Sequence, residues 1–159
     1  MHISVSLRIL GILLMLFSTA MLAPLIMALL ADDHTSTGFF SALGITFLSG
    51  LLLWLPVRNA QHDLRIRDGF LITSLFWTVL GVFGALPFYL NDFLNLTLTE
   101  AIFESISGLT TTGATVIVGL DDLPQSILIY RQLLQWLGGI GIIVVAVAVL
   151  PMLGIGGMQ

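Results

Sequence analysis

The sequence predicts an all-α membrane protein with four transmembrane helices and one short helix that enters the membrane without crossing it. Of the 159 residues, 57% are hydrophobic and only 9% are charged, and the mean hydropathy is +1.07. Soluble domains carry about 25% charged residues. Four long intervals contain no charged residue, and a polar stretch that is too short to span separates the third from the fourth. These observations place the chain in the membrane class.

Each of the four intervals is long enough to cross the hydrocarbon core of a bilayer, which requires about 20 apolar residues. The intervals are 9–31, 34–57, 69–91 and 132–159. A cleaved signal peptide has an apolar region of about 7–15 residues followed by a small-residue cleavage site. The first interval is longer and has no clear site of this kind before Asp32. We therefore expect it to be a retained transmembrane helix.

The positions of the arginines orient these helices. Basic residues near helix ends favour the cytoplasmic side. Arg8 precedes the first interval and three more arginines lie in the loop 58–68, whereas the loop 31–37 has none. We therefore expect both termini in the cytoplasm and residues 91–126 on the outer side of the membrane.

The composition also excludes several classes of protein. The absence of cysteine excludes disulfides, thiolate metal sites and thiol catalysis. The five basic residues form no patch for nucleic acid. No Ser/His or Asp/Asp pair lies inside the spanning intervals, and the three histidines lie outside the apolar cores. We therefore expect no enzymatic activity, no catalytic residues and no bound organic cofactor.

The polar stretch SISGLTTTGATVIVGL, residues 105–120, is the strongest indication of function. It has no charge but six hydroxyl side chains. In lipid, backbone that is not helical survives only where protein buries it or where it lines a water-filled cavity. We therefore expect this stretch to enter the membrane from outside and to leave on the same side.

A short helix is predicted to lead into the polar stretch. Thr97-Leu98-Thr99-Glu100 fits a capping box, in which Thr97 caps the helix and Glu100 reaches back. Apolar residues then continue on one face as far as Leu109, so the helix should extend to about residue 110. Its last carbonyls carry the negative end of the helix dipole, which favours a cation in the membrane interior.

The segment TTTGAT, residues 110–115, follows this helix. A dehydrated cation needs oxygens in place of its hydration shell, and extended backbone carbonyls can supply them. Gly113 permits backbone angles that aim successive carbonyls toward one axis. Threonine hydroxyls can add ligands or tie the strand to its surroundings. The order of a threonine, a second residue and a glycine is similar to the pattern of a potassium-channel filter.

Three segments carry a resemblance that covers nearly the whole chain. They are DGFLITSLFWTVLGVFGALPFYL at 68–90, AIFESISGLTTTGATVI at 101–117 and RQLLQWLGGIGIIVVAVAVLPMLGIGGMQ at 131–159. The chain resembles the N-terminal part of a bacterial Trk-type potassium transporter membrane subunit (TrkH/TrkG), within the Trk/Ktr/HKT superfamily. The resemblance implies four helix–pore-loop–helix units around one K⁺ pathway, with an additional helix pair before the first unit.

Applied to this sequence, the resemblance implies two parts. Residues 1–66 would form the N-terminal helix pair, and residues 67–159 the first unit, with a pore helix at about 98–110 and a filter at about 111–115. By motif match the filter residues are Thr111, Thr112, Gly113, Ala114 and Thr115. Their backbone carbonyls would coordinate K⁺, the transported ion.

Only one filter motif occurs in the chain. We therefore expect a fragment that supplies one of four filter strands to a potassium uptake channel or transporter of the bacterial inner membrane, and that does not conduct alone. The resemblance implies as partners the remaining units, a cytoplasmic nucleotide-binding regulatory subunit of the TrkA type, a second copy in a homodimer, and membrane lipid. The alternative is a small non-conducting membrane protein that binds or modulates a membrane partner.

Two charged residues inside the predicted unit have alternative interpretations. An ionisable residue in an embedded helix, such as Glu104, is a functional candidate. We favour a supporting role, in which Glu104 bonds to backbone amides behind the filter without touching K⁺. Arg131 lies near the outer end of the fourth helix, against the charge rule. It either bonds to Glu104 or to Asp121 and Asp122, or extends to the outer interface.

The glycines and prolines of the spanning intervals are interpreted as packing and bending positions. Gly138, Gly139 and Gly141 should allow close helix packing, because small residues let membrane helices approach one another. A hinge is the alternative. Pro24 and Pro87 lie toward the outer ends of their helices and are expected to kink them.

Overall fold

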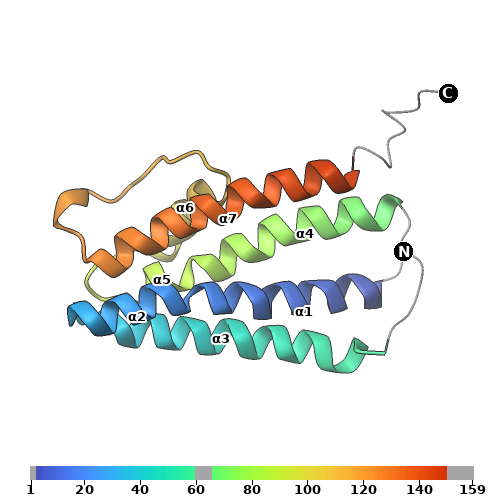
Figure 1. The fold of residues 1–159 in the computed structure, drawn as a ribbon, viewed down its shortest axis with the longest axis horizontal. Coiled ribbons are helices and arrows are strands. Elements are labelled where there is room, and N and C mark those ends of the chain that lie inside the picture. Colours follow the sequence, from blue (N-terminus) through green and yellow to red (C-terminus); the bar gives the residue numbers. More distant parts are fainter. Residues whose placement is uncertain (1–2, 60–65, 150–159) are drawn as a thin grey trace.

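The computed structural model describes residues 3–59 and 66–149, whose regular elements are all helices (Figure 1). The α-helices are α1 (Ile3–Ala20), α2 (Leu22–Ala31), α3 (Ser36–Trp54), α4 (Ile66–Gly84), α5 (Leu86–Tyr89), α6 (Leu98–Leu109) and α7 (Gln125–Val149). Two 3₁₀ turns, η1 (Leu55–Val57) and η2 (Leu120–Asp122), complete the described elements. The predicted all-α class is confirmed. Arg65 and the predicted last part of the fourth span, 150–159, lie outside the described residues.

Four helical segments of the described chain are long and apolar enough to cross a membrane. They are Ser4–Ala31, Ser36–Val57, Ile72–Tyr89 and Gln125–Ile143, which confirms the four predicted spans. They run side by side, with the beginning of α1 and the end of α7 at the same end of the molecule (Figure 1). The fourth helix begins at Gln125, seven residues before the charge-free interval at 132. Arg131, in the second turn of this helix, does not interrupt it, because its charge is paired with Glu104 inside the protein.

Two of the spans are interrupted close to the expected prolines. Proline has no amide hydrogen and cannot bond to the carbonyl four residues before it. For Pro24 this carbonyl belongs to Ala20, which is the last residue of α1. For Pro87 it belongs to Phe83, one residue before α4 ends at Gly84. Each proline therefore divides its span into a long helix and a shorter one.

Two glycines bring the first two spans into backbone contact. A β-carbon added to Gly11 of α1 would lie 2.7 Å from the carbonyl oxygen of Gly50 in α3. A β-carbon added to Gly50 would lie 2.8 Å from the carbonyl oxygen of Gly11. Side chains cannot occupy these positions without separating the helices, so α1 and α3 pack as closely as their backbones permit.

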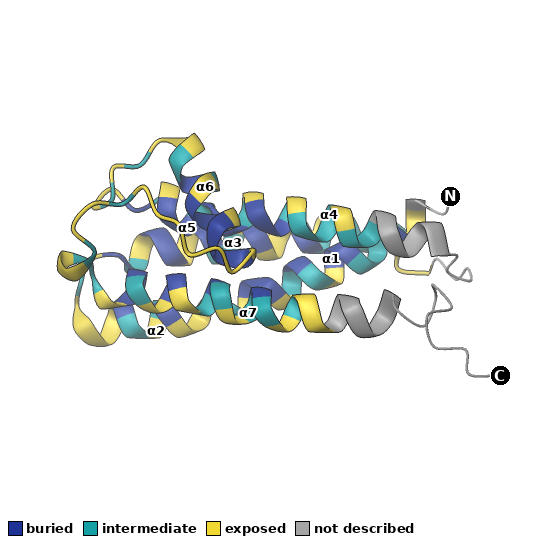
Figure 2. Ribbon diagram, turned by 90° about the horizontal axis from the view of Figure 1, so that it is seen from above, coloured by how far each residue is buried: buried dark blue, intermediate teal, exposed yellow. Residues whose placement is uncertain are grey.

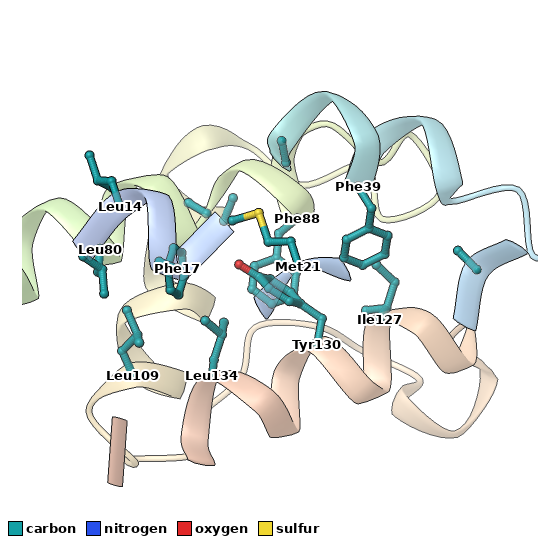
Figure 3. Close-up of a cluster of buried hydrophobic side chains, with 14 residues drawn as sticks. Leu14, Phe17, Met21, Phe39, Leu80, Phe88, Leu109, Ile127, Tyr130 and Leu134 are labelled. Atoms are coloured by element: carbon teal, nitrogen blue, oxygen red, sulfur yellow. The ribbon is translucent and has the colours of Figure 1, made fainter. Parts of the chain in front are cut away.

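Tyr130 of α7 connects the helices near the centre of the core (Figure 3). Its ring packs edge-on against Phe39 of α3 at a centroid distance of 5.6 Å and tilted against Phe88 of α5 at 5.1 Å. Its hydroxyl donates a hydrogen bond of 2.8 Å to the carbonyl oxygen of Gly84, where α4 ends. This buried tyrosine therefore joins three of the four spans and satisfies its own polar group.

Exposed residues recur along the helices on the outside of the bundle (Figure 2), and many of them carry large apolar side chains. Leu30, Phe40 and Leu52 are 78%, 69% and 69% exposed. In water such a surface would favour aggregation, whereas in a bilayer it faces lipid or further protein. The outer surface thus agrees with the membrane class.

The loop between the first two spans is tied to the beginning of α7. The Asp33 carboxylate accepts hydrogen bonds from the hydroxyls of Thr35 and Ser126, both at 2.6 Å. It also accepts bonds from their amides at 3.2 and 3.3 Å. Burial acts to raise the pKa of Asp33, but the bonds from Ser126 and Thr35 outweigh it, so the pKa lies below its ordinary 3.8.

The segment between α5 and α7 enters the bundle and returns to the same end (Figure 1). Helix α6 runs into the bundle, where it packs against α4 and α7. An extended stretch then leads back from the end of α6 to η2 and the beginning of α7. The chain direction therefore reverses at the end of α6, within the bundle.

Candidate functional site

The beginning of α6 has the predicted capping box. Thr97 is in an extended conformation, and its hydroxyl accepts a bond of 3.4 Å from the amide of Glu100. The Glu100 carboxylate accepts a bond of 2.8 Å from the amide of Thr97 and one of 2.7 Å from its hydroxyl. These bonds from the hydroxyl and the amide lower the pKa of Glu100. The local spacing therefore fixes where the helix begins, as expected.

The end of α6 is a Schellman motif that continues into the predicted filter. The amide of Thr111 donates to the carbonyl of Gly108 at 2.9 Å, and the amide of Thr112 donates to that of Ser107 at 3.0 Å. The amide of Gly113 also reaches the Ser107 carbonyl, at 3.3 Å. Two adjacent amides thus converge on one carbonyl oxygen, in the manner of a backbone nest. The helix ends at Leu109, one residue before the expected end at about 110.

Thr111 has an unusual backbone conformation. It occupies the left-handed position of the motif with φ +58°. Glycine usually fills this position, because a β-branched side chain is strained there. Gly113 has φ +74°, and Thr112 between them has no positive φ. Strained residues of this kind cluster at functional sites, where the surrounding structure maintains them.

The stretch that follows α6 has carbonyls without a hydrogen-bond donor among the described residues. The amides of residues 111–113 are bonded back to α6. No hydrogen bond from a described residue reaches the carbonyl oxygens of Thr111, Thr112 and Gly113, and all three residues are exposed. The Ala114 carbonyl differs, because the Ser107 hydroxyl donates to it at 2.7 Å. Its remaining lone pair is still available to a second partner.

Glu104 and Arg131 form a buried ion pair behind the exposed stretch. Glu104 Oε2 contacts Arg131 Nη1, and the residues are only 3% and 9% exposed. Glu104 Oε1 accepts bonds of 2.6 Å from both the Thr115 hydroxyl and the Val116 amide. Each buried charge therefore has an opposite charge and further hydrogen bonds, which a buried pair requires.

The hydroxyl of Thr115 completes this network. It donates to Glu104, accepts a bond of 3.0 Å from Arg131 Nη1 and accepts another of 3.0 Å from the Ile117 amide. Of the partners considered for Arg131, the structure pairs it with Glu104. Asp121 and Asp122 lie exposed in η2.

The sequence did not single out two residues that contribute to this site, Ser107 and Gly138. Ser107 holds the stretch twice, by its carbonyl and by its hydroxyl. In the sequence, Ser107 is distinguished only as one of the six hydroxyl residues of the hydroxyl-rich stretch. Gly138 packs against the end of α6, where an added β-carbon would lie 1.8 Å from the Leu109 carbonyl oxygen. Close packing was expected equally of Gly139 and Gly141, whose nearest atoms would lie at 4.0 and 3.6 Å.

Comparison with known proteins decides the family. The family model described as TrkH, cation transport protein, matches residues 35–159. The chain belongs to the TrkH family. The Trk system potassium uptake protein TrkH of Halomonas elongata is 58% identical over 158 residues, which cover 99% of this chain and 33% of that protein. The protein of the same name from Escherichia coli is 54% identical over 100% of this chain and 33% of its own length.

A solved structure of the TrkH family has the same fold. The crystal structure of the potassium transporter TrkH from Vibrio parahaemolyticus superimposes with a TM-score of 0.93 at 56% sequence identity. The match covers 100% of this chain and 34% of that one. The chain thus spans about a third of the length of the TrkH proteins it matches. These relatives are named as transport proteins rather than enzymes.

Proposed function

We propose that this chain supplies one strand of a K⁺-selective filter to a potassium uptake protein. The observation that carries the proposal is the stretch at 111–113, whose amides are all bonded to α6 while its three carbonyls accept no hydrogen bond from a described residue. A carbonyl array of this kind can replace the hydration shell of a monovalent cation. The relatives named as potassium uptake proteins support K⁺ as that cation.

Helix α6 would be the pore helix of a re-entrant loop in this arrangement. Its capped N-terminus would lie toward the outer side of the membrane, and its last turn lies inside the bundle, next to the stretch 111–113. The negative end of its dipole would stabilise a cation there. Residues 67–159 would then form the first unit, and residues 1–66 the preceding helix pair.

The filter residues would have unequal roles. Thr111, Thr112 and Gly113 would offer unbonded carbonyls to K⁺. Ala114 would offer only the lone pair that Ser107 leaves free. Thr115 would hold the strand to Glu104 through its hydroxyl and contribute its own carbonyl.

Glu104 and Arg131 would support the filter from behind. Their ion pair holds the amide of Val116 and the hydroxyl of Thr115, so it fixes the outer end of the strand to α6 and α7. The carboxylate is fully engaged by these groups, which leaves K⁺ coordination to the backbone.

The complete protein would surround one pathway with four such units in the bacterial inner membrane, with both termini of this segment in the cytoplasm. Its partners would be the remaining units, a cytoplasmic nucleotide-binding subunit of the TrkA type, a second copy in a homodimer, and membrane lipid. With one filter strand, this chain alone would not conduct.

The filter assignment is tested by Gly113→Ser in a full-length transporter that contains this sequence. A side chain at φ +74° distorts the strand, so the ratio of K⁺ to Na⁺ uptake should fall about fivefold or more, since about 1 kcal/mol of differential binding gives that factor. Isotope or ion-flux measurements in cells that depend on this transporter would record the ratio.

Gly119→Ser is the matched control, because Gly119 has φ +75° and lies outside the proposed filter, directly before η2. It should leave the uptake ratio unchanged. A Gly113→Ser protein that is present at normal levels with an unchanged ratio would contradict the filter assignment. That result would favour the alternative of a non-conducting membrane protein whose hydroxyl-rich loop is an ordinary surface connection.

A further inference from the structure

The end of α6 rests directly on the backbone of α7 at one residue. A β-carbon added to Gly138 would lie 1.8 Å from the carbonyl oxygen of Leu109 and 2.6 Å from its carbonyl carbon. Both atoms belong to the backbone at the end of a helix, so no flexible side chain can move aside. Only glycine at 138 is compatible with this position of α6.

The contact is specific to Gly138. At Gly139 the nearest atom to an added β-carbon is the Thr111 methyl group at 4.0 Å. At Gly141 it is an atom of the Phe76 ring at 3.6 Å. Both are ordinary van der Waals distances, so these two glycines would accept a methyl group.

A second close contact holds the same helix end. A β-carbon added to Gly108 of α6 would lie 3.0 Å from Cβ of Leu134, which is one turn before Gly138 on α7. Gly108 and Leu109 therefore press against α7 through adjacent residues, and the distance between the two helix axes has little freedom here.

A displacement of this helix end would directly displace the candidate filter. Ser107, whose carbonyl holds the amides of Thr112 and Gly113, lies two residues before Leu109. The last turn of α6 moves as a unit because its backbone is hydrogen-bonded. A shift of Leu109 away from α7 would therefore shift the amides of the filter strand and the carbonyls attached to them.

We propose that Gly138 is a specificity-determining positioning residue, whose contact with the Leu109 carbonyl sets how far the filter strand lies from α7. This inference rests on the proposed function. Ion selectivity depends on the size of the carbonyl cage and on the number of carbonyls that reach the ion. A displacement of one strand out of four changes both.

The test is Gly138→Ala in a full-length transporter containing this sequence, with the amount in the membrane measured together with K⁺ and Na⁺ uptake. The ratio of K⁺ to Na⁺ uptake per molecule should fall about fivefold or more, a factor that corresponds to about 1 kcal/mol. Gly139→Ala is the control, and it should keep the ratio. Gly108→Ala, which needs only a small adjustment of Leu134, should lower the ratio in the same direction but less.

The outcomes separate this inference from the filter assignment. If Gly113→Ser changes the uptake ratio but Gly138→Ala and Gly108→Ala do not, the filter stands and the positioning role is wrong. If Gly138→Ala is absent from the membrane, Gly108→Ala decides: a lowered ratio supports the inference and an unchanged ratio overturns it. An equal fall in Gly139→Ala would also overturn it.

Discussion

At the scale of single residues, the site depends on backbone and side-chain hydrogen bonds that hold the backbone after α6 in place. Thr111 keeps a strained left-handed conformation because its own amide and the next one are bonded to the end of α6. Glu104 is buried with a full set of donors, including the Val116 amide and Arg131. The sequence singled out Glu104 and Arg131 by their charge in an apolar setting. It favoured backbone amides as partners of Glu104, but it left open which partner Arg131 would have.

Removing one partner of the buried pair should be more harmful than removing both. Arg131→Met leaves the Glu104 carboxylate without its cation, and the loss should be about 3 kcal/mol of stability. Combining it with Glu104→Gln removes the unpaired charge and should recover part of that loss. Thermal inactivation of the purified full-length protein in detergent would measure the single and double variants. Additive losses would contradict the direct coupling of the two side chains.

At the scale of elements, local patterns determined the helix ends better than the helix contacts. The capping box located the beginning of α6 at Leu98, because it depends on a spacing of three residues. The prolines located the two helix interruptions, because each proline lacks the amide that would bond to the carbonyl four residues before it. The contacts between helices depend on which glycine faces which neighbour. The sequence does not show which of its 16 glycines face another helix.

Two glycines of the first two spans should respond differently to substitution by alanine. Gly11→Ala would place a methyl group 2.7 Å from the Gly50 carbonyl, so the resulting separation of α1 and α3 should reduce stability by about 1–3 kcal/mol. Gly44→Ala in α3 meets no atom within 4 Å. It should be neutral or stabilise the helix by up to about 1 kcal/mol. Thermal unfolding of both variants would show this contrast, and equal destabilisation would refute the packing argument.

At the scale of the whole molecule, the first two spans are joined to α7 by a polar tie in the loop between α2 and α3. Asp33, in the loop after α2, bonds to Thr35 at the beginning of α3 and to Ser126 in the first turn of α7. The hydroxyls of Thr35 and Ser126 also lie 2.7 Å apart, and both residues are buried. This tie connects the first loop to the helix that carries Arg131.

The tie should weaken in acid. The pKa of Asp33 is lower in the folded protein than its ordinary 3.8, so its contribution to stability is present above that value and is lost as the pH falls through the folded pKa. The stability advantage of the wild type over Asp33→Asn should therefore be constant near neutral pH and decline as the pH falls below about 4. Thermal inactivation across this pH range would measure it.

Asp32→Asn is the matched control, because Asp32 is the adjacent carboxylate and is exposed. Its difference from the wild type should show no comparable dependence on pH. An Asp33→Asn difference that persists unchanged well below pH 4 would contradict the proposed role of the carboxylate charge.

The sequence by itself determined the membrane class, the four spans, the capped beginning of α6 and the position of the hydroxyl-rich turn that follows it. These features depend on composition and on spacings of a few residues, so local physical chemistry is sufficient. Only the tertiary structure decided the partners: Arg131 with Glu104, 27 residues away, and Asp33 with Ser126, 93 residues away. It alone distinguished Gly138 from Gly139. Such contacts depend on how helices are placed and rotated against one another, which the packing of the whole bundle sets.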